Sequence, residues 1–212
     1  QLNIKRKKSN YSINSKTFDG TKILDRILFS KSDGNSFDVF EKLNSKISIN
    51  FDTIYITNED YLTDFKADMI VNNNQIKDLI LSSQFATKED LKLSIKTNSN
   101  NEKITDLFAG NAKPLVKKYD FIKGFEGGYL KFDSIEKNKV SNSNLKIFDF
   151  KLKEVPALTK LLTLASLQGI ADLLTGEGIR FNEFEMIFNN KAGLMTIEEI
   201  YSLGPSISIL MD

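Results

Sequence analysis

The chain has 212 residues, enough for one large or two small domains with a hydrophobic core. Its 29 basic and 28 acidic residues nearly balance, so no overall field favours nucleic acid or an acidic substrate. It has no cysteine and no histidine, which excludes disulfides and thiolate metal sites and removes the commonest general base.

The N-terminal segment is basic over Lys5 to Lys8. We interpret this run as a solvated strand, and a patch for phosphates or lipid headgroups is the alternative. No stretch of 18 uncharged apolar residues and no signal peptide are present, so no segment is expected to span a bilayer. The chain begins with Gln1 and stops after an apolar strand, and we expect it to be part of a longer protein.

Strand patterns dominate the chain. Leu91, Leu93 and Ile95 alternate with polar residues, which is typical of a sheet with one wet face. Further strands are expected over 2–8, 47–51, 65–71, 76–85, 129–135, 144–152, 179–188, 194–201 and 207–211. Asn72 to Asn74 and Asn98 to Asn101 have the composition of hairpin turns.

Several of these strands change phase partway. Leu145 and Ile147 share one face, whereas Phe148, Phe150 and Leu152 share the other. A slip of one residue moves every later side chain to the opposite face unless a bulge or a bend restores it. Repeated slips of this kind predict a curved antiparallel sheet.

Helices are expected to be few. Short ones are predicted over 21–29, 36–43 and 111–121, the last with Pro114 in its first turn, where proline is tolerated. The main helix is predicted over 155–174, between Pro156 and the stop at Gly176 and Gly178. It is apolar nearly all round, which favours burial on most sides.

The residues offer little catalytic chemistry. Glu183/Glu185 and Glu198/Glu199 are paired acids, which we interpret as the wet side of strands, with a glycosidase pair or a metal site as the alternative. A Ser-Lys pair is conceivable, but nothing places one in a strained turn. The loop from Gly124 to Gly128 lacks the GK[ST] ending of a phosphate loop and is predicted to be a turn. We therefore expect no enzyme, no cofactor and no metal.

The chain has 16 phenylalanines and no tryptophan, and many of the phenylalanines lie on predicted strands. A curved sheet cannot bury both faces unless something lies in it. Two explanations compete: the long helix fills the concavity, or an apolar ligand does.

Three segments are similar to a known family. Gly110 to Gly128 joins a short helix to a paired glycine and a strand, and Leu145 to Ser166 joins a strand to the apolar helix. Leu173 to Phe181 carries the glycine stop, before strands that end in the motif Ser-Leu-Gly-Pro-Ser. Together these segments resemble the C-terminal region of the AsmA-like family of Gram-negative envelope proteins, in its alphaproteobacterial style.

The resemblance implies a periplasmic segment of a protein that is anchored in the inner membrane by a helix outside this chain. It also implies a relationship to bridge-like lipid transfer proteins, whose sheets form an apolar groove for phospholipid moving towards the outer membrane. Residues 1–105 correspond to the strand-rich part that precedes the region, and residues 106–212 to the region itself, within one continuous domain.

The expected fold class is therefore mainly β (α+β): a curved antiparallel sheet that forms an open groove, with one long apolar helix and two or three short ones. The expected partner is a phospholipid or another acyl lipid, with no nucleic acid. The candidate lipid-binding residues are Phe148, Phe150, Leu152, Leu161, Leu164, Leu167, Phe181, Phe184, Phe188 and Ile207. The alternative is a structural or assembly module of the envelope, whose groove is filled by its own helix and which binds protein partners.

Overall fold

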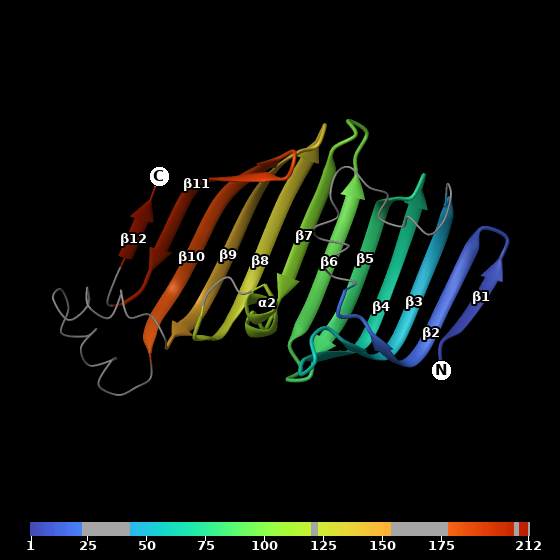
Figure 1. The fold of residues 1–212 in the computed structure, drawn as a ribbon, viewed down its shortest axis with the longest axis horizontal. Helices are drawn as coiled ribbons and strands as arrows, with labels where there is room; N and C mark the ends of the chain where they lie inside the picture. The colour runs from blue at the N-terminus through green and yellow to red at the C-terminus, as the bar shows by residue number, and fades with distance from the viewer. Residues whose placement is uncertain (23–42, 120–122, 154–177, 206–207, 212) are drawn as a thin grey trace.

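The computed structural model describes residues 1–22, 43–119, 123–153, 178–205 and 208–211. These residues form a single open sheet of twelve strands, which lie side by side in the order of the chain (Figure 1). The strands are β1 (Asn3–Lys7), β2 (Asn10–Asp19), β3 (Ser45–Tyr55), β4 (Tyr61–Asn72), β5 (Gln75–Phe85), β6 (Asp90–Thr97), β7 (Lys103–Ala109), β8 (Phe125–Lys137), β9 (Val140–Leu152), β10 (Ile179–Lys191), β11 (Leu194–Leu203) and β12 (Ser208–Met211).

Neighbouring strands are antiparallel with one exception, because β2 and β3 run parallel. Their connection, residues 20–44, is long enough for the crossover that parallel strands require. Most of the antiparallel pairs are joined by short turns, whereas residues 110–124 connect β7 to β8 and residues 153–178 connect β9 to β10. Three of the turns have two central residues with positive φ: Asn73–Asn74, Asn138–Lys139 and Ala192–Gly193. Such turns match the twist of the strands that they join. The turn at Asn73–Asn74 was predicted from the sequence.

The predicted fold class is wrong. The only helix among the described residues is α2 (Lys113–Lys118), with six residues, and the sheet includes a parallel pair. No long apolar helix and no set of short helices accompanies the sheet in the described part of the chain. The helices predicted over 21–29, 36–43 and 155–174 lie outside the described residues, apart from residues 21, 22 and 43, which are not helical. The division predicted at residues 105 and 106 falls inside β7, so the strands on both sides of it belong to one sheet.

The core lies on one face of the sheet. In β5 the side chains of Leu79, Leu81 and Phe85 are buried, whereas Ile80 between them is exposed. The same alternation in β6 buries Leu91, Leu93 and Ile95, as their period of two predicted.

The phase changes seen in the sequence are shared by neighbouring strands. In β9 both Ile147 and Phe150 are buried, because Asp149 between them has a φ of 54°. Phe150 is the register partner of Gly127 in β8 and of Phe181 in β10. Gly127 and Gly128 have φ values of 73° and 74°, so β8 bends at the same level. The bend keeps the register and moves later apolar residues back to the core face.

A second shared bend crosses β3 and β4, where Phe51 pairs with Phe65 beside Asp64, whose φ is 52°. Stacked phenylalanine rings lie at both bends. The ring centroids are 5.9 Å apart for Phe51 and Phe65 and 5.2 Å apart for Phe150 and Phe181. Stacked pairs of this kind contribute about 0.5–1.5 kcal/mol beyond their buried area, so they stabilise the sheet where its backbone is least regular.

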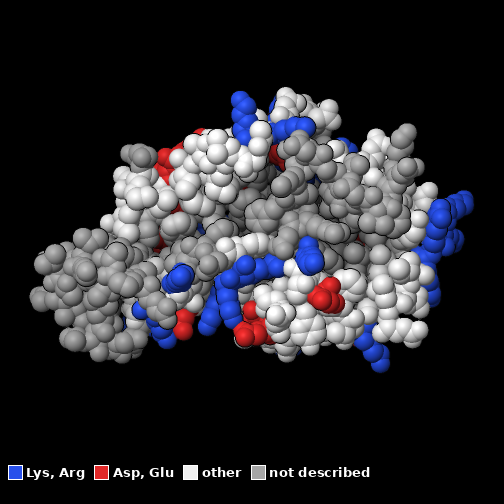
Figure 2. Space-filling view, in the orientation of Figure 1, with Lys and Arg blue, Asp and Glu red and all other residues white. Residues whose placement is uncertain are grey.

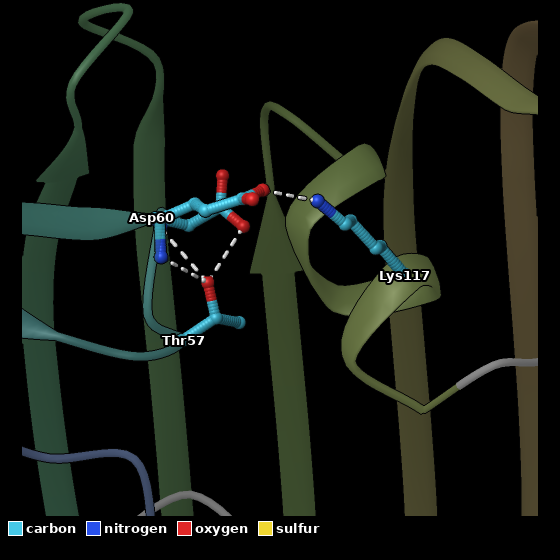
Figure 3. Close-up of polar contacts among 4 residues, drawn as sticks. Thr57, Asp60 and Lys117 are labelled. Atoms are coloured by element: carbon cyan, nitrogen blue, oxygen red, sulfur yellow. Dashed lines mark hydrogen bonds and ion pairs between the residues drawn. The ribbon is translucent and has the colours of Figure 1, made fainter.

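Helix α2 packs against β8 and covers part of the core face with Leu115 and Val116. It also connects the two halves of the sheet, since Lys117 forms an ion pair with Glu59 in the turn between β3 and β4 (Figure 3). That turn is held by Thr57, whose hydroxyl accepts the backbone N–H of Asp60 at 2.8 Å and donates to its carboxylate at 2.9 Å.

Adjacent residues of β5 test the assignment of the two faces. Leu79 is 0% exposed and Ile80 is 62% exposed. Leu79→Ala should lower the free energy of unfolding by about 2–5 kcal/mol, because it leaves a cavity in the core. Ile80→Ala should change it by less than about 1 kcal/mol. Urea denaturation measures both, and equal losses would contradict the assignment.

The shared bend predicts different costs for two glycines with similar φ. A Cβ added at Gly128 would lie 2.7 Å from the carbonyl oxygen of Phe148, whereas one at Gly193 would meet nothing within 4 Å. Both alanine substitutions should cost about 1 kcal/mol for the left-handed conformation. Gly128→Ala should cost about 1–3 kcal/mol more, because it overpacks the β8–β9 pair. Denaturant unfolding of the two variants gives the difference, and equal midpoints would contradict a close approach at Gly128.

Candidate functional site

One row of apolar side chains crosses the whole sheet. Each of the twelve strands contributes one residue, and each residue is the register partner of the next. The row is Ile4, Ile13, Ile49, Ala67, Leu81, Leu93, Leu107, Phe132, Leu145, Met186, Ile200 and Met211. We call it the apolar row.

Exposure along the apolar row rises towards both edges of the sheet. The central members, from Ala67 to Leu107, are buried. The two end members are solvent-exposed, Ile4 to 57% and Met211 to 55%. The hydrophobic face therefore extends beyond the buried core to the outermost described strands, β1 and β12.

The widest open part of this face lies on the last three strands. Ile197 pairs with Phe188, which packs against the core, yet Ile197 is itself 50% exposed. The open patch consists of Phe184, Met186 and Phe188 in β10, Met195, Ile197 and Ile200 in β11, and Met211 in β12. Contiguous exposed apolar surface marks sites that bind lipid, protein or another apolar ligand.

The predicted lipid-binding residues divide into three groups. Phe150, Leu152 and Phe181 are buried in the core. Phe184 and Phe188 belong to the open patch, where they are partly buried and pack against the core. Leu161, Leu164, Leu167 and Ile207 lie outside the described residues.

Phe148 differs from the other predicted residues because it lies on the opposite, polar face. Its ring stacks on Tyr129 with centroids 4.8 Å apart, and the ammonium of Lys131 lies 5.7 Å from its centroid. The bend at Asp149 separates Phe148 from Phe150. The predicted set lacks five members of the open patch: Met186, Met195, Ile197, Ile200 and Met211. The alternation of apolar with polar residues along these strands was the available signal.

The polar face carries an open hollow of about 470 Å³ across β5 to β8. It is lined by Ile80, Leu81, Ser82, Lys92, Leu93, Ser94, Asp106, Leu107, Phe108, Lys131, Phe132 and Asp133. Lys92 pairs with Asp90 at 2.8 Å and Ser94 donates to Asp106 at 3.3 Å. The hollow is thus bordered by charges of both signs, which gives it no net preference for an anion.

The first predicted acid pair, Glu183/Glu185, makes contacts between neighbouring strands of the sheet. Lys146 lies 3.0 Å from Glu185 and 3.9 Å from Glu183, and Asn144 donates to Glu185 at 2.7 Å. Burial acts to raise the pKa of Glu185, but these hydrogen bonds outweigh it and the pKa is lowered. The side chains of this pair are occupied by cross-strand contacts on the polar face. In the second pair, Glu198 accepts a hydrogen bond from Asn189 at 2.9 Å.

The described residues contain no cluster of three or more acids that could hold a metal ion. Within the same residues, no helix is long and apolar enough to cross a membrane. Comparisons with family models, curated proteins and solved structures find no match to the chain. The apolar row and its open patch are therefore the features on which a function can be argued.

The polar face predicts one effect of pH. Partial burial and the neighbouring Asp106 raise the pKa of Asp133. The folded state then holds this proton more tightly than the unfolded chain, so stability falls as pH rises from the ordinary value of 3.8 through the raised pKa. Asp133→Asn should therefore be more stable than the parent at pH 7, and the difference should disappear in acid.

Thermal unfolding of the parent and Asp133→Asn across this pH range measures the effect. Asp68 provides a matched control, because it lies in the same row of the polar face and accepts a hydrogen bond from Ser48 at 2.6 Å. Asp68→Asn should not raise stability. A gain in both variants would show that removing any negative charge from this face is enough.

Proposed function

We propose that this chain shelters the acyl chains of a phospholipid or another acyl lipid on the open part of its apolar face. In this proposal it is a periplasmic segment of an AsmA-like envelope protein, which is anchored to the inner membrane through a segment outside the chain. The lipid lies on β10 to β12, where Phe184, Phe188 and Ile197 contact its hydrocarbon.

One observation carries the proposal: the apolar row runs unbroken across twelve strands and remains exposed at β12, where Met211 is its last member. A protein that needed only a core would place its apolar residues where they are buried. Exposed apolar surface costs about 25 cal/mol per Å², and a lipid chain that covers it offsets this cost. Each methylene group that is removed from water contributes about 0.8 kcal/mol to binding. A few methylene groups of an acyl chain on this patch therefore give measurable binding.

The absence of reactive groups is compatible with this role. The chain contains neither histidine nor cysteine. Its described carboxylate clusters are held by lysines and asparagines on the other face. Transfer of a lipid along a surface breaks no covalent bond, so it requires binding area and no general base.

A pair of neighbouring substitutions in β11 tests the proposal. Ile197→Asp places a charge in the open patch, and we expect it to reduce binding of a fluorescent phospholipid by about tenfold or more, because a carboxylate against hydrocarbon is costly. Thr196→Asp adds the same charge to the opposite face of the same strand. It should leave lipid binding unchanged. Titration of each variant with vesicles that contain the fluorescent phospholipid measures binding, and native mass spectrometry then detects the bound lipid.

The proposal would be overturned if the parent protein is purified from cells without lipid and also binds no phospholipid in the titration. Equal loss of binding in the two variants would assign the effect to net charge, and would also count against the patch. Because Ile197 and Thr196 are both exposed, circular dichroism should show folded protein in each case.

A second candidate function is an assembly module of the cell envelope that binds a protein partner. The observation that favours it is the first half of β11, where Leu194 to Glu198 are exposed on both faces. Strand edges of this kind bind other chains by adding a strand. Parent protein that is recovered without lipid, with its patch covered by a protein, would favour this candidate.

A further inference from the structure

Five hairpin turns lie at the same end of the sheet. They join β1 to β2, β4 to β5, β6 to β7, β8 to β9 and β10 to β11 (Figure 1). The structure describes each of these turns together with the strands on both sides of it. We call the five turns, with three residues of each flanking strand, the basic end, because lysine and arginine predominate in it.

Every turn of the basic end carries lysine. The run from Lys5 to Lys8 leads into the first turn. The lysines of the other four turns are Lys77, Lys96, Lys103, Lys137, Lys139 and Lys191. Most of these residues are exposed, and Figure 2 shows lysine and arginine side chains at the upper margin of the molecule, where these turns lie.

Two acids, Glu102 and Glu136, are the only ones in the basic end, and both pair with its lysines. The carboxylate of Glu102 lies 2.9 Å from the ammonium of Lys137, and that of Glu136 lies 3.9 Å from the ammonium of Lys103. Each glutamate thus neutralises one lysine. The other basic residues leave a net positive charge that is spread over five turns, and a broad field of one sign attracts polyanions.

The opposite end of the sheet has a different balance. There Lys117 of α2 pairs with Glu59 in the turn between β3 and β4 (Figure 3). The ammonium of Lys153, after β9, lies 2.8 Å from the carboxylate of Glu126 in β8. Lysines and acids are therefore mixed at the described part of this end, and the two ends of the same strands differ in charge.

Aliphatic side chains are exposed beside the lysines of the basic end. Ile135 is 50% exposed two residues before Lys137, and Leu194 is 71% exposed directly after the turn between β10 and β11. Lysines next to exposed aliphatic side chains are typical of surfaces that lie at a membrane interface, where apolar groups enter the acyl boundary. Binding of unpaired bases uses aromatic side chains for stacking. Tyr11 is the only aromatic residue in the basic end, so its composition favours a lipid surface over nucleic acid.

We propose that the basic end docks on a membrane surface that contains anionic phospholipid. Lys8, Lys96 and Lys191, from three different turns, lie near the lipid phosphates, and Leu194 enters the interface. Each lysine close to an anionic surface adds to the attraction, so several turns together give binding that one turn alone does not. A surface of neutral phospholipid lacks this attraction.

This inference goes beyond the proposed lipid contact, because it concerns a membrane surface and not a single acyl chain. The two sites are neighbours, since Met195 of the open patch follows Leu194 in β11. Docking through the basic end brings the patch close to the lipid that it is proposed to shelter. The docking depends on lysines and the shelter on apolar side chains, so separate variants distinguish a failure of one from a failure of the other.

Sedimentation of the 212-residue chain with vesicles tests the docking. The parent should bind vesicles that contain phosphatidylglycerol and phosphatidylcholine in equal parts, and should bind pure phosphatidylcholine about tenfold more weakly. Higher salt should weaken binding to the anionic vesicles. Lys8→Gln/Lys96→Gln/Lys191→Gln should reduce that binding by about tenfold or more, because it removes positive charge from three turns.

Lys22→Gln/Lys88→Gln/Lys123→Gln is the matched control, because it removes the same charge from exposed residues at the opposite end. This variant should bind as the parent does, and circular dichroism should show folded protein in both variants. Equal weakening in the two variants would assign the binding to net charge and overturn the proposal. Ile197→Asp, which alters the open patch, should still sediment with the anionic vesicles.

Two further results would overturn the docking. The first is a parent that leaves anionic vesicles unbound, or that binds the two vesicle compositions equally well. The second is a parent that binds a fluorescent single-stranded oligonucleotide through the same three lysines and does not bind vesicles. That result would assign the basic end to nucleic acid.

Discussion

The structure depends on one constraint: twelve strands must present their apolar residues on the same face of one sheet. Side chains alternate along a strand, so a slip of one residue in a single strand would break the apolar row. The backbone does slip, at Asp149 in β9 and at Asp64 in β4. The row survives because neighbouring strands bend at the same level, with Gly127 and Gly128 beside Asp149. Stacked phenylalanines lie at both bends and stabilise the sheet where the pleat is interrupted.

The sheet has a buried centre and two outermost described strands, β1 and β12, and the centre differs in chemistry from these strands. The centre from Ala67 to Leu107 is buried, and helix α2 covers part of it while its Lys117 contacts the distant turn at Glu59. The edges keep the apolar row exposed. At β1 this exposure is combined with lysines, and at β11 with glutamates. The patch on β10 to β12 is the basis of the proposed lipid contact.

The polar face supports this arrangement without reactive chemistry among the described residues. Cross-strand contacts such as Lys146 with Glu185 and Ser48 with Asp68 neutralise or satisfy its charges. Each exposed ion pair contributes only about 0–1 kcal/mol to the stability of the fold. The polar face therefore contributes more to solvation than to stability. The crowded carboxylates Asp106 and Asp133 are an exception, because their repulsion and partial burial act against the folded state at neutral pH.

The sequence by itself determined the local features. The alternation of Leu91, Leu93 and Ile95 predicted both a strand and its buried face, because a period of two is a local property of the backbone. The asparagines at 72–74 predicted a hairpin turn, because they tolerate positive φ. The phase changes were visible as well. The predicted fold class was wrong, because the described residues have one helix of six residues and their sheet includes a parallel pair.

Only the tertiary structure decided which residues share a surface. Phe148 and Phe150 belonged to one predicted set, yet a left-handed residue between them sends them to opposite faces. The parallel pairing of β2 with β3 depends on a long crossover, which leaves no local pattern. The apolar row takes one residue from each strand, from Ile4 to Met211, and each of these residues alone resembles an ordinary core position. Register between strands is set by turns and bends along the whole chain, and so the row exists only in the folded sheet.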